Sequence, residues 1–490
     1  MTSETTALLA SNTQQQRKTR DWWECSTVFL VFLINFLLQG SLFIVLAPRM
    51  QIYESILCQY HAPGNIGEVV PMNGDRCKDL DVQAELAFIL GMEEFLTVFL
   101  SVLTIPYSLL ADQYGWSSIL SLSLCGIVLE MIWPFFICLF AGRVSLYWVL
   151  FAVAFEAIGG GIMVSVTMLQ LILSLLVSQE SRTRVFLYLV GSSFIATAIG
   201  QAVSTLLMNT NVWLPACLGC GLTLLALALS LLLDRTMVRR AADYSTNVNY
   251  REPRLSPSLN SRPARELCLV PLRTLQQNPQ AVAILIATFT FPLGENSMVN
   301  IILLYISKRY GLSIAEANFL VAFSSIAKLF TYLVGIPSLG YVLKKYRGVT
   351  SFGRDRIIVQ VEGILLLIGA LCISLAPTVT LTFFGIIVSS SGMAIITILR
   401  SLVTDLVQPQ DITIVYCLMS MVMRIGSGIA GPIFAWGFGF GMRLGQKWTN
   451  LPFLLAAIVF MAGTIVLSSI PKTPRLRTDE EPGPQGTNGE

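Results

Sequence analysis

Residues Val212–Leu233 read VWLPACLGCGLTLLALALSLLL and include no charged side chain. A helix of about 20 apolar residues is long enough to cross the hydrocarbon core of a bilayer. About twelve stretches of this kind fill most of the sequence between Thr27 and Ile470, and a buried helix of a soluble domain rarely continues so far without a charge. One stretch could be a signal anchor, but so many together predict an all-α polytopic membrane protein.

Charged residues, prolines and glycines divide the apolar sequence into two sets of six predicted spans. The first set is Cys25–Ala47, Ala84–Ala111, Ser117–Phe140, Leu146–Val177, Val185–Met208 and Val212–Leu233. The second set is Ala281–Ile306, Ala315–Val342, Ile357–Leu375, Val379–Val403, Ile412–Phe440 and Pro452–Ile470. Two sets of equal size are the pattern of a duplicated transporter, and they predict two pseudo-symmetric six-helix bundles.

The segments outside the spans complete the domain organisation. We expect a cytoplasmic N-terminal tail, an N-terminal bundle, a cytoplasmic linker rich in Arg, Pro, Ser and Asn, a C-terminal bundle and a disordered cytoplasmic tail. These parts correspond to residues 1–24, 25–233, 234–280, 281–470 and 471–490. Most of the 32 Lys and Arg residues fall in segments that are cytoplasmic if both termini are inside, as the positive-inside rule requires.

The composition excludes several classes of function. Charged residues are 12% of the chain, about half of the roughly 25% of a globular domain, and the mean hydropathy is +0.69. A net charge of +3 is too small to indicate nucleic-acid binding. We find no nucleotide-binding motif, no cluster of metal ligands and no nucleophile–base pair, so we expect neither a cofactor nor an enzyme.

In this orientation the connection from Pro48 to Gln83 lies outside the membrane. It holds Cys58 and Cys77, which can form a disulfide worth about 3 kcal/mol or remain two free thiols. It also holds His61, the only histidine of the chain, which we interpret as a solvated loop residue because one histidine does not make a metal site.

Ionisable residues at membrane depth are the candidates for function, because each costs about 2.5 to 3.5 kcal/mol to insert. Glu94 shares a small, polar helical face with Gly91, and Glu156 shares one with Gly160. Glu295 follows the helix-breaking sequence Pro292–Gly294, which could open the backbone. The candidate cavity residues are Glu295, Glu156, Glu94, Lys328, Arg424, Asn35, Gln39 and Asn296.

A carboxylate in a partly dry cavity can bind and release one proton, and Lys328 or Arg424 could balance it when it is ionised. We favour Glu295 for this coupling role because of the adjacent breaker sequence, and Glu156 is the next candidate. The alternative for each acidic residue is a structural ion pair between packed helices, an alternative that weighs most for Glu93 and Glu130.

The second predicted span ends in Pro106–Gly115, which reads PYSLLADQYG. This sequence resembles the cytoplasmic loop motif of the major facilitator superfamily, G-x-L-x-D-R-x-G-R-R. Asp112 and Gly115 match that motif, whereas Ser108 replaces its first glycine and Gln113 its first basic residue.

Other segments resemble fungal members of the superfamily, namely Cys77–Ala87, Ile306–Tyr310, Ala315–Ala317 and Asn450–Phe453. The resemblance covers residues 25–470. It implies two six-helix bundles around a central cavity that is lined by spans one, four, seven and ten. A glycine stripe in the eleventh span permits close helix approach, and it is equally compatible with a displaced exporter motif.

The resemblance and the buried charges together predict a secondary transporter that moves a small organic solute by alternating access, coupled to protons, with the direction left open. The alternative is a nutrient receptor built on a transporter scaffold. We expect a functional monomer in the plasma or vacuolar membrane. The latter location would agree with an acidic dileucine signal formed by Glu4, Leu8 and Leu9.

Overall fold

The computed structural model describes residues 3–61, 75–101, 114–177, 182–245, 279–296, 301–347, 350–404 and 412–471, together with positions 103, 106–107, 110–111 and 406. Within these residues the chain is helical and contains no strand. The prediction of an all-α polytopic membrane protein is therefore confirmed.

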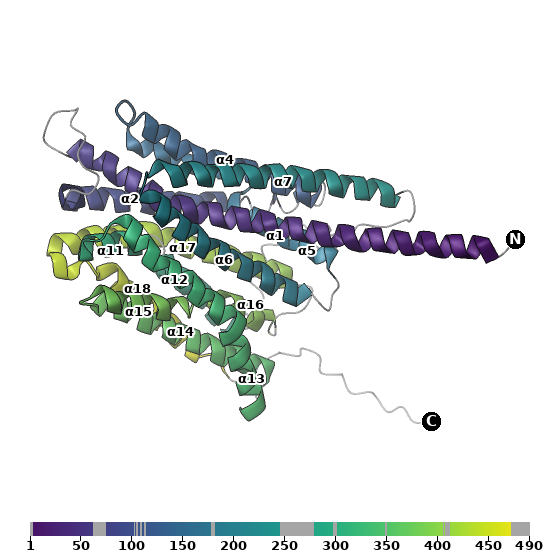
Figure 1. The fold of residues 1–490 in the computed structure, drawn as a ribbon. Helices are drawn as coiled ribbons and strands as arrows, with labels where there is room; N and C mark the ends of the chain where they lie inside the picture. The colour runs from purple at the N-terminus through teal and green to yellow at the C-terminus, as the bar shows by residue number, and fades with distance from the viewer. Residues whose placement is uncertain are drawn as a thin grey trace, which may run out of the picture.

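The N-terminal part of the chain contributes eight described helical elements. They are α1 Ser3–His61, η1 Asp75–Lys78, α2 Leu80–Ser101, α4 Trp116–Leu139, η2 Leu146–Ala157, α5 Gly161–Leu176, α6 Arg182–Met208 and α7 Trp213–Ser245. They lie together in one half of the molecule, where α1 packs against α6 and α7, and α4 packs against η2, α5 and α7 (Figure 1).

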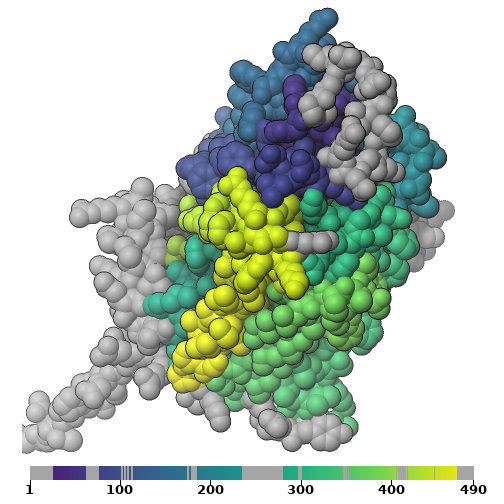
Figure 2. Space-filling view, turned by 90° about the vertical axis from the view of Figure 1, so that its left-hand side faces the viewer, coloured from purple at the N-terminus to yellow at the C-terminus, as the bar shows by residue number. Residues whose placement is uncertain are grey.

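The C-terminal part forms the other half. Its elements are α10 Pro279–Asn296, α11 Ile302–Tyr310, α12 Ile314–Phe330, η4 Thr331–Gly335, α13 Ile336–Arg347, α14 Ser351–Leu375, α15 Val379–Ser390, α16 Ile395–Thr404, α17 Ile412–Leu444, η5 Gln446–Trp448 and α18 Leu451–Ser468. The colours of the two chain halves also separate in the space-filling view (Figure 2).

Ten of the described helices are long and apolar enough to cross a membrane. They correspond to ten of the predicted spans. The two remaining spans are represented by α2 and by α10 with α11. Helix α2 carries Glu85, Glu93 and Glu94, which lower its hydropathy, and the apolar part of α10 is short, covering Gln280–Glu295. The acidic residues of α2 and the short apolar part of α10 therefore explain why these two segments are not among the ten.

Helix α1 is longer than predicted. We expected the first span to end at Ala47, but the helix continues through Pro48 to His61. A proline inside a helix costs about 3 kcal/mol. The residues beyond it offset this cost because Met50, Tyr53 and Leu57 are almost fully buried. Hydropathy alone could not show this packing.

The halves meet mainly through two helix pairs, α2 with α17 and α6 with α12. Between α6 and α12, Asn318 Nδ2 donates to Gln201 O at 3.0 Å and Thr205 Oγ1 donates to Ala315 O at 3.2 Å. Between α2 and α17 the contact depends on glycine: a Cβ at Gly428 would overlap the side chain of Val98. The glycine stripe of α17 therefore brings the halves close together.

Candidate functional site

The fourth span is interrupted near its middle. Its outer part is the 3₁₀ helix η2, which ends at Ala157, and the α-helix α5 begins at Gly161. Gly159, Gly160 and Gly161 between them all have positive φ, at 84°, 81° and 65°. Side chains rarely tolerate this conformation, so a run of three glycines is what permits the break.

Neighbouring elements satisfy the backbone groups that the break releases. Tyr107 Oη donates to Ala157 O at 2.5 Å and Ser123 Oγ donates to Gly161 O at 2.6 Å. Ser165 Oγ in turn donates to Ser123 Oγ at 2.8 Å. An unpaired backbone group in the hydrocarbon region costs several kcal/mol. These contacts therefore make the interruption a stable part of the fold.

The tenth span, which is the fourth of the second half, is interrupted as well. Helix α15 ends at Ser390, and α16 begins at Ile395. The backbone N–H of Ala394 donates to Glu362 Oε2 on α14 at 3.0 Å, and Glu362 is only 4% exposed. A helix N-terminus attracts an anion, so the carboxylate stabilises the start of α16. Interruptions of corresponding spans in two repeats point to a ligand site between them.

A group of charges lies beside the first interruption. Arg49 Nη2 on α1 is 3.4 Å from Glu93 Oε2 on α2, and Tyr53 Oη donates to Glu93 Oε1 at 3.3 Å. Glu93 therefore forms a structural ion pair, which was one of the two alternatives that we gave for this residue. Glu94, on the next position of α2, faces α17: its Cβ lies 3.1 Å from the place where a Cβ of Gly431 would be.

Glu130 on α4 and Glu156 on η2 form no such ion pair with a described residue. Glu130 lies near enough to Glu156, and Glu156 near enough to Arg424 of α17, for their charges to interact. Glu156 folds over Gly161, whose Cβ would lie 3.0 Å from Glu156 Oε1. Glu130 Oε2 and Arg424 Nε are both buried with no hydrogen-bond partner among the described residues.

In the second half, Glu295 on α10 and Lys328 on α12 lie near enough for their opposite charges to interact. The helix does not open at Pro292–Gly294 as expected, because α10 continues through both residues to Asn296. Gly294 instead allows close packing, since its Cβ would meet the ring of Phe460 at 2.5 Å.

The remaining candidates differ in position. Asn35 Nδ2 donates to Leu189 O and to the hydroxyls of Ser192 and Ser193, so it ties α1 to α6. Gln39 on α1 is half-buried. Gly115 precedes α4 with φ 94°, which explains a glycine there. The side chains of Asn296, Asp112, Glu4, Leu8 and Leu9 lie outside the described residues.

At the end of the molecule that we predict to face outward, lysines join the two halves. Lys78 Nζ donates to Ser307 O at 3.3 Å and to Leu312 O at 3.1 Å, while Lys308 Nζ donates to Lys78 O. A disulfide between Cys58 and Cys77 holds Lys78 beside α1. We call Lys78, Lys308 and their acceptors the outer latch. Burial lowers the pKa of Lys308, and the charge of Lys78 acts in the same direction.

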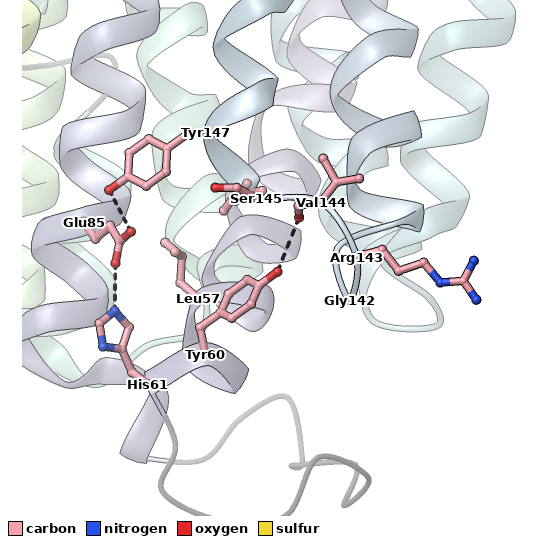
Figure 3. A pocket seen from close by; sticks show the side chains of 10 residues that line it. Leu57, Tyr60, His61, Glu85, Gly142, Arg143, Val144, Ser145 and Tyr147 are labelled. Carbon is pink, nitrogen blue, oxygen red and sulfur yellow. Dashed lines mark hydrogen bonds and ion pairs between the residues drawn. The ribbon is translucent and has the colours of Figure 1, made fainter.

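A cavity of about 500 Å³ opens at the outer end of the first half (Figure 3). His61 Nε2 is 2.7 Å from Glu85 Oε2, and Tyr147 Oη donates to Glu85 Oε1 at 2.8 Å. His61 is solvent-exposed, as we interpreted it, but it is not a loop residue, because it is the last residue of α1 and contacts α2. The cavity lies away from the buried charges.

Sequence reasoning missed Glu362, Ser123 and the interruption at Gly159–Gly161. The sequence did show Glu362 as an acidic residue inside a predicted span, which marks a candidate for function. The glycine run was visible too, but its role depends on the helix packed against it. Among the described residues there is no group of His, Cys, Asp or Glu that could hold a metal ion.

Comparison with known proteins agrees with this architecture. The MFS efflux pump atnC of Emericella nidulans is 26% identical over 447 residues, covering 88% of this chain and 85% of that protein. The efflux pump ustT of Aspergillus flavus is 26% identical over 436 residues, covering 87% and 84%.

Two solved structures share the fold at low sequence identity. The D-xylose-proton symporter has a TM-score of 0.63 at 11% identity, covering 91% of this chain and 98% of that one. The nucleoside transporter NupG has a TM-score of 0.58 at 14% identity, again covering 91% and 98%. The family model for the Major Facilitator Superfamily matches residues 28–431, and the chain therefore belongs to this superfamily as a multi-pass integral membrane protein.

Proposed function

We propose that the protein is a secondary active transporter that exports a small organic solute in exchange for protons, by alternating access between its two halves. The observation that carries the proposal is a set of half-buried charges in the membrane-spanning part of both halves. Glu130 and Glu156 lie beside the interrupted fourth span of the first half, and Arg424, Glu295 and Lys328 lie on α17, α10 and α12 of the second half. Buried charges at membrane depth require a functional reason.

Relatives that are named efflux pumps support the outward direction of transport. The outer latch supports alternating access, because its contacts join the halves at one end and must break for that end to open. A solved relative in fold is a proton symporter, which is compatible with coupling to protons.

In the proposed cycle Glu295 is the coupling residue. When it is ionised, Lys328 balances its charge. When it takes a proton, Lys328 loses its partner, and the pair favours a different arrangement of α10 and α12. The electrostatic cost of an unbalanced buried charge amounts to several kcal/mol, enough to shift the populations of two conformations.

The substrate can be found first by expressing the protein in an efflux-deficient yeast strain and screening for compounds against which it protects growth. A labelled form of such a compound is then used with purified protein in proteoliposomes. Glu295→Gln should abolish accumulation driven by a pH gradient while counterflow remains, since counterflow needs no net proton movement.

Asp81→Asn is the matched control, because Asp81 is an exposed carboxylate at the start of α2. This control should behave as wild type. Full pH-driven accumulation by Glu295→Gln would transfer the coupling role to Glu156 or Glu94. Binding of the compound without counterflow in the wild type would instead favour a receptor.

A further inference from the structure

The outer cavity of the first half adjoins a second hollow. The cavity of about 500 Å³ is the one that holds His61 and Glu85 (Figure 3). The second hollow, of about 370 Å³, is lined mainly by Leu96 of α2 and by apolar residues of η2, and we call it the apolar groove. Tyr147 lines both spaces. Every described residue that lines either space belongs to the first half, so the combined site lies outside the interface between the halves.

The apolar groove lies where the protein contacts lipid. Trp148 and Phe151 line it and are exposed, although both belong to the candidate span Leu146–Leu173. The outer cavity, in contrast, is bordered by the turn that precedes this span and by Tyr60, and tyrosine is enriched at the membrane surface. The combined site therefore leads from the membrane surface into the hydrocarbon region, as an amphiphilic ligand from the bilayer requires.

The polar groups of the outer cavity are arranged to accept hydrogen bonds. Tyr147 Oη donates to Glu85 Oε1 at 2.8 Å, and His61 Nε2 lies 2.7 Å from Glu85 Oε2. Tyr60 Oη donates to the carbonyl oxygen of Ala141. These donors are thus already engaged, whereas a carboxylate offers about four acceptor positions. Glu85 can therefore accept one more hydrogen bond, and the site suits a polar head that donates one.

This arrangement favours a sterol over a phospholipid. A phosphate group needs donors, but the guanidinium of Arg143 points away from the cavity (Figure 3). A sterol carries one hydroxyl group that can donate, and its rigid body is apolar and uncharged. The segment Arg143–Leu150 also places a basic residue, a tyrosine and a leucine in the order of a pattern proposed for sterol contact, which by itself is of low specificity.

We propose that the protein binds a membrane sterol at this place, with the sterol hydroxyl donating to Glu85 and the ring system lying in the apolar groove against Trp148 and Phe151. The proposal rests on the two adjoining spaces and on the contacts of Glu85. It does not depend on the transported solute, the direction of transport or the coupling residue. A sterol here contacts η2, which is the outer part of the interrupted fourth span.

The test uses a cholesterol analogue that carries a photoreactive diazirine and an alkyne tag, with purified full-length protein in phosphatidylcholine nanodiscs. Saturable labelling should map by mass spectrometry to the peptides that contain Leu96 or Phe151, and excess cholesterol should remove it. Cholesterol methyl ether has no hydroxyl to donate and should compete about tenfold less well, as expected for the loss of one hydrogen bond to a carboxylate. A photoreactive phosphatidylcholine should not show this saturable labelling.

Two kinds of variant separate binding from folding. Leu96→Trp fills the apolar groove without changing the polar groups and should abolish the saturable labelling. Leu206→Trp, the same change at an exposed position of α6, is the matched control and should label like wild type. Glu85→Leu should weaken sterol binding about tenfold, whereas Glu85→Gln keeps an acceptor and should retain most of the affinity.

Four results would overturn the proposal. They are the absence of saturable labelling, labelling confined to other peptides, equal competition by cholesterol and its methyl ether, and unchanged labelling of Leu96→Trp. Saturable labelling of the same peptides by the phosphatidylcholine probe would assign the site to a phospholipid instead.

Discussion

Gly91 of α2 and Gly431 of α17 face each other across the interface of the two halves with no room for a side chain on either. A Cβ on Gly91 would lie 2.6 Å from the carbonyl oxygen of Gly431, and a Cβ on Gly431 would collide with the carbonyl oxygen of Gly91. The backbones of the two halves are therefore in direct contact. A rocking motion of one half against the other must either pivot at this contact or break it.

Gly431→Ala should separate α2 from α17 and lower stability by about 1 to 3 kcal/mol, because backbone must move to admit the methyl group. Transport should fall with it. The melting temperature and counterflow rate of the purified protein measure the two effects. Gly221→Ala on α7 is the control, since its Cβ would meet nothing within 4 Å. If both variants melt alike, the close contact does not contribute to stability.

Ser123→Ala should destabilise the interruption of the fourth span. It removes the additional hydrogen bond that Ser123 Oγ donates to Gly161 O at the start of α5, and it leaves Ser165 Oγ without its acceptor. Loss of a partner for a buried polar group costs about 1 to 3 kcal/mol. Chemical or thermal unfolding in detergent would show the loss. Ser145→Ala, at the exposed position before η2 where the serine makes no side-chain cap hydrogen bond, serves as a control with a smaller expected effect.

Replacement of Glu362 tests the interruption of the tenth span. Glu362→Ala leaves the N–H of Ala394 without an acceptor, whereas Glu362→Gln keeps a carbonyl oxygen there. We therefore expect the Ala variant to lose about 1 to 3 kcal/mol of stability and the Gln variant clearly less. Equal losses would mean that the negative charge, and not the hydrogen bond, stabilises α16.

The outer latch should bias the molecule toward a closed outer end. In the double variant Lys78→Met with Lys308→Met, we expect the outer contact of α6 with α12 to open more often. A cysteine placed at Ala315, which is 5% exposed, reports this opening through its rate of reaction with an impermeant maleimide. The rate should rise several-fold. Lys447→Met removes an exposed lysine nearby, and a similar rise there would exclude the latch as the cause.

The Cys58–Cys77 disulfide should be present in the mature protein. Alkylation of intact protein without prior reduction should leave both cysteines unmodified by mass spectrometry. Cys58→Ser with Cys77→Ser should lower stability by about 3 kcal/mol, as expected for a closed loop of roughly this length. Alkylation of either residue before reduction would show free thiols instead.

Hydropathy was sufficient to predict most spans and the helical class, because a bilayer imposes length and apolarity directly on the sequence. The interruptions were harder to place. Pro292 looked like a breaker but lies in a continuous helix, whereas the glycines from Gly159 to Gly161 interrupt theirs. The difference depends on partners: Tyr107 donates to the released carbonyl of Ala157, and Ser123 donates to Gly161 O at the start of the next helix.

Charged residues were located well by sequence, but their pairing was not. Glu94 and Glu156 were predicted to lie on small, polar faces, and both are close to α17 or to the glycine break. The partnership of Arg49 with Glu93 depends on α1 continuing beyond Pro48, which hydropathy did not predict. Contacts between helices that are distant in sequence leave no local pattern.

Every acceptor in the outer latch is a main-chain oxygen, belonging to Ser307, Leu312 or Lys78. A main-chain oxygen remains whatever residue occupies its position, so point substitutions at the receiving surface cannot abolish these acceptors directly. Substitutions of the two lysines can therefore shift the equilibrium between a closed and an open outer end. The side chains at the accepting positions can meanwhile change without loss of the latch.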